Sequence, residues 1–375
     1  MGGSVRDLVL GKEISDVDIA TSATPEEVKS LFSHTVDVGI EHGTVLVLHH
    51  HDSYEVTTFR TEGTYQDFRH PDSVTFVRSL EEDLMRRDFT INALAVNDKE
   101  EIVDYFGGIE DLEREIIRCV GNPMERFNED ALRMMRAVRF AGQLGFSIES
   151  DTFNAIRTLK ANLERVAVER MKVEFEKMIL SPHRDLAFKA FVESELYHSC
   201  PDFKEAKETL LKLGEFPLEK MTITQAWILF AYYERLSIPQ LRKVLKNWKS
   251  SNDQISTILT GYQTLLARLE KEWDAFLAYE CPEVLAIEVE QLLPGIGHSE
   301  QLVELEEVYR QLPIRSMKDI QIDGFGVKEA LGLEKMGPII GEVLQALQTE
   351  ILSGRLPNEN AEIVSWIRNN FNESK

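Results

Sequence analysis

The chain of 375 residues has no apolar run near the roughly 20 residues that a membrane-spanning helix needs. Its first ten residues include Arg6 and Asp7 where a secretory leader has an apolar stretch, so we expect a cytoplasmic protein. Cysteine is scarce: only Cys119, Cys200 and Cys281 occur, too far apart for metal-ligand spacing. We therefore predict buried free thiols, with neither a zinc site nor a disulfide.

Basic residues are also fewer than acidic residues. The sequence has 42 Lys and Arg against 64 Asp and Glu, a formal net charge of -22. This balance argues against a protein that coats nucleic acid by bulk attraction, and no DNA or membrane partner is expected. The charge is uneven, however: residues 271–310 carry two basic and ten acidic residues, and residues 125–177 carry ten basic and nine acidic. An RNA partner should approach the second stretch and avoid the first.

The pattern along the chain predicts an α+β protein of two to four domains. Residues 1–120 mix short β-rich runs with turns, and the sequence after about residue 124 has helical periodicity. Residues 44–49 and 54–59 are typical of a hairpin, and we expect one sheet over residues 14–106. The polar stretch 61–80 is too long for a simple turn, which predicts a mobile loop over a site.

Two aspartates one residue apart, Asp16 and Asp18, follow the segment GGSVRD at residues 2–7. If this part is extended, both carboxylates share one face of a strand while Val17 and Ile19 point into a core. Such a pair suits Mg²⁺, which takes oxygen ligands and bridges to a triphosphate. The glycines let the main chain approach phosphate oxygens. A lone Asp-x-Asp is usually a solvated turn, so the inference depends on the joint pattern.

A second polar pattern lies on the helix expected over residues 124–145. Asp130, Arg133, Arg136 and Arg139 are three residues apart, which predicts a slowly turning polar stripe. Single pairs at this spacing are commonly surface salt bridges of small energy. A carboxylate only accepts hydrogen bonds and a guanidinium only donates them. Asp130 beside Arg133 would therefore match the edge of cytosine or adenine and reject uracil and guanine, while Arg136 and Arg139 hold phosphate or brace the pair.

These segments, with three more, resemble in order and spacing the five motifs of class II CCA-adding enzymes (tRNA nucleotidyltransferases), most closely the Bacillus-type branch. The further motifs are RRDFTINA at 86–93, DYFGG at 104–108 and ERMKVE at 169–174. The resemblance implies a polymerase-β-like nucleotidyltransferase head, a mixed sheet with helices, followed by an all-α neck, body and tail in a seahorse shape. The expected parts are the head at 1–123, the nucleotide-binding neck at 124–182, the body at 183–275 and the tRNA-binding tail at 276–375.

The resemblance also implies a role for each matching residue. It makes Asp16 and Asp18 the catalytic magnesium ligands. The nucleotide contacts that it implies are Gly3, Arg6, Arg87, Asp130, Arg133, Arg136 and Arg139. It leaves Asp88 and Asn92 near the nucleotide, Glu169 and Arg170 as braces of the neck helices, and Glu55 equally a further carboxylate or a structural strand residue.

Two departures from the family pattern are visible. Tyr105 stands where the family usually has proline, and the family has a helix and a strand before the Gly-Gly at which this sequence starts. A head without that inner strand should expose an unpaired hydrogen-bonding edge and lose core contacts. Our hypothesis is a miscalled start, in which a GTG valine codon was read as an initiator; sequencing the upstream DNA tests it.

The expected reaction is template-independent addition of C, C and A to the 3′ end of tRNA from CTP and ATP, by two-metal nucleotidyl transfer that releases pyrophosphate. The expected partners are tRNA, held at its 3′ end and elbow, with CTP and ATP. CC-only enzymes of this family lack part of the segment 61–80, which is intact here. An A-adding enzyme, a poly(A) polymerase and an inactive RNA-binding remnant without the first strand stay open as alternatives.

Overall fold

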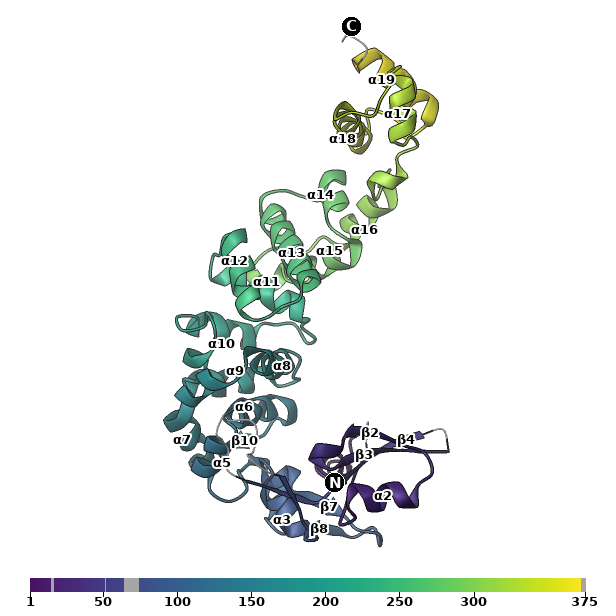
Figure 1. Ribbon diagram of the computed structural model, residues 1–375. Helices are drawn as coiled ribbons and strands as arrows, with labels where there is room; N and C mark the ends of the chain where they lie inside the picture. The colour runs from purple at the N-terminus through teal and green to yellow at the C-terminus, as the bar shows by residue number, and fades with distance from the viewer. Residues whose placement is uncertain (15–16, 51, 64–73, 372–375) are drawn as a thin grey trace. The chain divides into compact units, whose positions relative to one another are not determined.

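The computed structural model describes residues 1–14, 17–50, 52–63 and 74–371. These residues fall into two compact units, one made of residues 1–223 with 243–250 and the other of 224–242 with 251–375. The first unit contains every described site residue predicted above. Strands with helices between them come first in this unit and are followed by a run of helices, so the chain is an α+β protein (Figure 1).

The N-terminal part of the first unit is built around a four-stranded sheet in the order β1-β4-β3-β2. The pair β1–β4 is parallel, and β4–β3 and β3–β2 are antiparallel. One apolar face of this sheet buries Val45, Val47 and Val56 against Val28 of helix α2. The helix α2 begins at a capping box formed by Thr24 and Glu27. The elements here are α1 (Gly3–Val9), β1 (Asp18–Thr21), α2 (Pro25–Leu31), β2 (Thr35–Gly39), β3 (Thr44–His49) and β4 (Asp52–Thr58).

The predicted hairpin is confirmed as β3 and β4, but the single sheet expected over residues 14–106 is wrong. Two further antiparallel pairs, β5–β6 and β7–β8, are separate from the four-stranded sheet. The loop predicted over residues 61–80 was wrong at both ends, because β5 and β6 form an antiparallel pair there. Its residues 64–73, between these strands, lie outside the described residues. The elements that complete this part are β5 (Arg60–Glu62), β6 (Val74–Phe76), α3 (Leu80–Met85), β7 (Leu94–Val96), β8 (Ile102–Asp104), α4 (Gly108–Glu113) and β9 (Ile116–Ile117).

Strand β1 lies at the edge of its sheet. The side chains predicted to enter a core, Val17 and Ile19, are instead 57% and 39% exposed. They line a cavity of about 460 Å³ together with Leu8, Ile14 and Val96. That prediction was wrong because alternation fixes only which residues share a face, and no described strand covers the outer side of β1.

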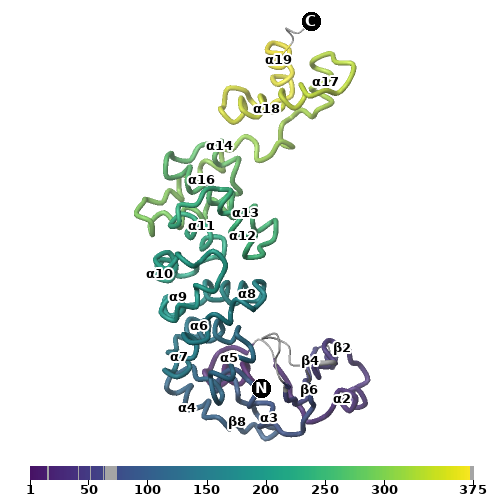
Figure 2. Tube along the Cα trace, turned by 60° about the vertical axis from the view of Figure 1, so that its left-hand side comes forward, coloured from purple at the N-terminus to yellow at the C-terminus, as the bar shows by residue number. Residues whose placement is uncertain are grey.

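The helical part of the first unit stacks α6, α8, α9 and α10 (Figures 1 and 2). Its core is aromatic: the ring of Phe175 lies 5.0 Å from Phe203 and 5.0 Å from Trp248, centroid to centroid. Burial of these rings stabilises the stack through apolar area and tilted ring contacts. The elements are α5 (Pro123–Glu129), α6 (Leu132–Leu144), β10 (Ser147–Ile148), α7 (Ser150–Leu159), α8 (Val168–Ile179), α9 (Arg184–Glu193) and α10 (Lys207–Glu215). Helix α12 (Ile238–Asn247) is divided, with residues 243–247 in this unit.

The helix predicted over residues 124–145 is interrupted. Helix α5 ends at Glu129, and Asp130 is extended, with φ -135° and ψ 103°. The Asp130 carboxylate accepts a hydrogen bond from the main-chain N–H of Leu132 at 3.1 Å. Aspartate competes with helical hydrogen bonding in this way, so the single long helix was a wrong prediction. Asp130 therefore does not share the helical register of the three arginines.

The second unit is all helical and has two apolar clusters, one centred on Trp273, Leu277 and Leu305 and one on Val343, Leu347 and Ile363. The three cysteines of the chain are buried free thiols, as predicted. No described helix combines the length and the apolar composition that a bilayer crossing requires. The elements are α11 (Ile223–Tyr233), α13 (Asn252–Glu270), α14 (Ala275–Glu280), α15 (Glu283–Glu290), α16 (Leu302–Gln311), α17 (Gly324–Ala330), α18 (Ile339–Leu352) and α19 (Asn360–Phe371).

Candidate active site

Carboxylates lie on two neighbouring strands at the edge of the four-stranded sheet. Asp18 begins β1 and pairs in register with Glu55 of β4. Residues paired in register on adjacent strands point their side chains to the same face, and both of these are exposed. Asp16 lies outside the described residues. The register thus sets Glu55, which sequence reasoning left undecided, beside the predicted metal ligand.

The glycine segment brings the main chain close to an arginine. The main-chain N–H of Gly2 donates to the carbonyl oxygen of Leu94 at 2.8 Å, and Gly2 has φ +73°. A Cβ at Gly2 would lie 2.5 Å from Nη1 of Arg87. Gly3 follows as the first residue of α1, and Arg6 is buried on the same helix. The segment therefore brings Gly2 against the guanidinium of Arg87, and Gly3 and Arg6 follow it on α1.

Arg87 is a half-buried guanidinium with weak partners, its side chain being 23% exposed. Its Nη1 reaches the carbonyl oxygen of Asn92 at 3.4 Å and its Nη2 lies 3.6 Å from Asp83, while its Nε has no hydrogen-bond partner among the described residues. Burial lowers the pKa of Arg87, and the negative charges of Asp83, Asp88 and Asp18 only partly offset that effect. A half-buried cation with such incomplete pairing fits an anionic ligand.

Asp130 and Arg133, the predicted base readers, are each held by a residue of opposite charge. The Arg170 guanidinium donates to both carboxylate oxygens of Asp130, at 3.3 and 2.8 Å. Arg133 donates to Glu129 at 2.6 Å and to the carbonyl oxygen of Arg86 at 2.9 Å. The last bond joins the second reader to the main chain of Arg86, the residue before Arg87. A carboxylate and a guanidinium thus lie three residues apart, at the start of α6 and close to the predicted triphosphate contacts.

Arg136 joins the two parts of the first unit through Asp88. Its Nε donates to Asp88 at 2.8 Å, and its Nη2 lies 2.6 Å from the same oxygen. Asp88 also accepts from Asn92 at 3.2 Å, and Asn92 accepts from Arg6 at 2.7 Å. Burial alone would raise the pKa of the Asp88 carboxyl, but the charge and hydrogen bonds of Arg136, with the amide of Asn92, hold it below its usual value. The chain of contacts links Arg6 of α1 to Arg136 of α6.

Arg139 is held by Glu174 of α8, to which its Nε donates at 2.5 Å. Burial lowers the pKa of Arg139 despite the charge of Glu174. Three guanidinium groups surround the ring of Phe140: the Cζ atoms of Arg139, Arg6 and Arg136 lie 3.8, 5.3 and 5.4 Å from its centroid. Cation–π contacts of this kind favour a cluster of cations that like charge alone would disperse.

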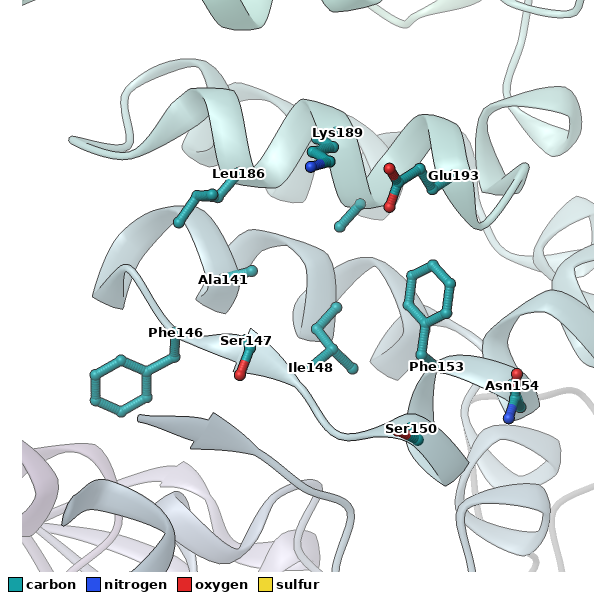
Figure 3. A pocket seen from close by; sticks show the side chains of 11 residues that line it. Ala141, Phe146, Ser147, Ile148, Ser150, Phe153, Asn154, Leu186, Lys189 and Glu193 are labelled. Carbon is teal, nitrogen blue, oxygen red and sulfur yellow. The ribbon is translucent and has the colours of Figure 1, made fainter. Parts of the chain in front are cut away.

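Three of the described site residues, Asp18, Arg6 and Arg139, line two separate cavities. Asp18 lines the 460 Å³ cavity at β1, and Arg6 and Arg139 line another of about 460 Å³ with Lys177. A third cavity of about 470 Å³ is lined by none of the predicted site residues: it lies between α9, which supplies Lys189 and Glu193, and the segment from β10 to α7 (Figure 3). Proximity to Arg87 and Asp88, rather than cavity size, defines the candidate site.

Sequence reasoning missed the residues that hold the site together. Only the packing shows that Glu129 pairs with Arg133 and Glu174 with Arg139. Only the packing shows, likewise, that Asp88 pairs with Arg136 and Arg170 with Asp130. One signal was available for Glu174, since it lies in the motif at residues 169–174. The described residues contain no cluster of three potential metal ligands. Asp18 and Glu55 nevertheless supply the oxygen donors that a hard divalent cation takes, so the residues present fit such an ion.

A mixed-sheet head with an acidic edge, followed by helices that carry an arginine cluster, defines a nucleotidyltransferase. Residues 1–118 match the family described as Poly A polymerase head domain, 145–207 match Probable RNA and SrmB- binding site of polymerase A, and 218–367 match tRNA nucleotidyltransferase domain 2 putative. A family of this kind implies a divalent metal ion.

Relatives that match over nearly the whole chain assign it to a more specific family. The chain is 47% identical over 369 residues to the CCA-adding enzyme of Enterococcus faecalis, covering 98% of this chain and 91% of that protein, and 43% identical over 371 residues to that of Bacillus cytotoxicus, covering 98% and 93%. The crystal structure of Bacillus stearothermophilus CCA-adding enzyme in complex with CTP matches with a TM-score of 0.88 and 37% identity, over 98% of this chain and 91% of that one. The chain belongs to the CCA-adding enzyme family, and the resemblance to its Bacillus-type members is confirmed.

Proposed function

We propose that this chain adds C, C and A to the 3′ end of tRNA from CTP and ATP, without a nucleic-acid template, in the cytoplasm. The observation that carries the proposal is Arg87, a half-buried and incompletely paired guanidinium on which the negative charge of Asp18 acts, and which follows Arg86, whose carbonyl oxygen accepts a hydrogen bond from Arg133. A nucleoside triphosphate supplies both complements that this arrangement lacks: phosphate oxygens for Arg87 and a base edge for Asp130 and Arg133.

In this proposal the nucleotide lies along the start of α6. Asp130 and Arg133 take the base edge, and Arg6, Arg87, Arg136 and Arg139 with Gly3 hold the ribose and the triphosphate. The arginines donate to phosphate oxygens and keep the α-phosphorus in line with the tRNA 3′ hydroxyl. The transfer forms the bond from that hydroxyl oxygen to the α-phosphorus and breaks the bond to pyrophosphate, which leaves.

The metal in the proposal is Mg²⁺, held by Asp16 and Asp18, with Glu55 as a further oxygen ligand on the neighbouring strand. When bound, such ions lower the pKa of the attacking hydroxyl and neutralise charge on the leaving group. Asp18 and Glu55 are exposed at the sheet edge, where a cation and its remaining waters have room. In this proposal the carboxylates of the sheet edge bind the cation, and the guanidinium groups around Phe140 bind the anionic triphosphate.

The larger organisation is part of the proposal. We keep the head at 1–123, the neck at 124–182, the body at 183–275 and the tail at 276–375, with the tail holding the tRNA elbow. The segment 61–80, which distinguishes full CCA addition from CC addition, is present in the sequence. Its central residues 64–73 lie outside the described residues, so this choice depends on sequence alone.

The test uses purified protein and tRNA that ends at the discriminator base. Labelled CTP alone should give two additions, and CTP with ATP should give three, with CCA as the added sequence. Addition of A alone would indicate the A-adding enzyme, and a long A tract would indicate a poly(A) polymerase. No addition with any nucleotide, in protein that still binds tRNA, would indicate the RNA-binding remnant and overturn the proposal.

A further inference from the structure

The ion pair between Asp130 and Arg170 connects two parts of the neck that are 40 residues apart in the sequence. Arg170 lies in the first turn of α8, and Asp130 lies between α5 and α6. Nη1 donates to Oδ1 at 3.3 Å and Nη2 to Oδ2 at 2.8 Å. The two side chains are 17% and 25% exposed, so solvent has limited access to the pair. A bidentate guanidinium fixes the plane of a carboxylate, which a single hydrogen bond does not.

This clamp matters because Asp130 has no helix to orient it. Its main chain is extended, and a side chain at such a junction has more rotamers available than one inside a helix. Oδ1 also accepts the N–H of Leu132 at 3.1 Å. The three bonds use three of the about four acceptor positions of a carboxylate. About one acceptor position then points in a fixed direction, and a base amino group that pairs with Asp130 must meet it there.

Arg133 is clamped separately. Glu129, at 2.6 Å, comes from the end of α5, only four residues earlier in the sequence. The two reader side chains therefore receive their orientation from different elements, one from α5 and one from α8. Loss of Arg170 should release Asp130 and leave the ion pair of Arg133 in place.

Resting on the proposed function, we infer that Arg170 is a positioning residue for nucleotide selection, which acts by fixing the carboxylate plane of Asp130. It does not touch the nucleotide in this account. A released carboxylate can rotate to relieve its clash with the uracil or guanine edge, so discrimination falls further than the rate of C addition does.

The experiment measures kcat/KM for CTP and for UTP with the full chain and tRNA that ends at the discriminator base. Arg170→Met should lower the CTP/UTP ratio about tenfold or more, since one mispaired buried group corresponds to about a factor of ten. Arg170→Lys keeps the charge and loses the fork, so its ratio should lie between those of Arg170→Met and the unchanged chain. The matched control is Lys172→Met, which removes the half-buried pair of Lys172 with Glu176 on the same helix. The control should keep the original ratio.

A merely structural Arg170 would lower kcat/KM for both nucleotides by the same factor and leave the ratio unchanged. That result, in variants whose circular dichroism shows the folded chain, would overturn the inference. If Arg170→Met does not fold, Arg170→Lys decides by the same ratio. Failure of the proposed function looks different, because the unchanged chain would then add neither C nor A.

Discussion

Asp88 and Arg136 form an ion pair at 2.6 Å that joins the segment after α3 to helix α6, with the carboxylate nearly enclosed and the guanidinium one-third exposed. The same carboxylate accepts from Asn92, and through Asn92 it connects to Arg6. Two of the predicted nucleotide contacts, Arg6 and Arg136, therefore belong to one network that runs through Asp88 and Asn92.

We predict that Asp88→Asn destabilises the chain by about 2 kcal/mol at neutral pH, because it leaves Arg136 without its closest charge. The pKa of Asp88 is lowered in the folded state, so its contribution is complete above the unfolded value and is lost as the pH falls through the folded value. Urea unfolding of both proteins should show a constant difference from pH 7 to about 5 and a shrinking one below. A difference that grows toward acid pH would contradict this assignment.

Arg87→Met should separate function from stability. Since the guanidinium is half-buried with weak partners, its replacement by an apolar side chain should change the free energy of unfolding by no more than about 1 kcal/mol. Nucleotide binding should fall at least tenfold, as a charge-assisted phosphate contact is lost. Isothermal titration with CTP and urea unfolding measure the two quantities. A large loss of stability with unchanged CTP affinity would show that Arg87 is structural.

Gly2→Ala and Gly11→Ala form a matched pair. Both glycines have positive φ, +73° and +64°, so alanine is strained at either position. Only at Gly2 does the added Cβ meet Arg87, whereas at Gly11 nothing lies within 4 Å. We expect the two variants to lose similar stability, and only Gly2→Ala to weaken CTP binding. Equal CTP affinity in the two variants would show that Gly2 does not contribute to the nucleotide site.

The acidic edge gives a prediction about metal. Asp16→Ala or Asp18→Ala should abolish nucleotide incorporation and leave tRNA binding intact, as gel-shift titration would show. Glu55→Ala should keep activity but raise the Mg²⁺ concentration needed for half the maximal rate, because one oxygen donor on β4 is lost. Incorporation by either aspartate variant at the original rate would refute the metal assignment, and an unchanged Mg²⁺ requirement in Glu55→Ala would leave that residue structural.

Local sequence patterns predicted what depends on neighbours in the chain. Alternation at residues 44–49 and 54–59 gave the hairpin of β3 and β4, and isolated cysteines gave buried thiols. The break at Asp130 was missed because helical periodicity continues across it, while the Asp130 carboxylate accepts from the main-chain N–H of Leu132. The exposure of Val17 was missed because it depends on what covers β1, which alternation cannot specify.

For the candidate site, too, the sequence predicted some features and only the fold revealed others. Motifs named the residues with chemical function, but their partners are set by packing: Asp88 for Arg136, Glu174 for Arg139, and the strand register for Glu55. A charged side chain can form an ion pair with many others in a sequence of 28% charged residues, and only the fold selects one.

The most direct measurement is a crystal structure of the chain with CTP and Mg²⁺. The account predicts the triphosphate between Asp18 and the guanidinium groups of Arg87 and Arg136, with the cytosine edge paired to Asp130 and Arg133. A triphosphate bound elsewhere, or a cytosine that touches neither reader, would contradict it.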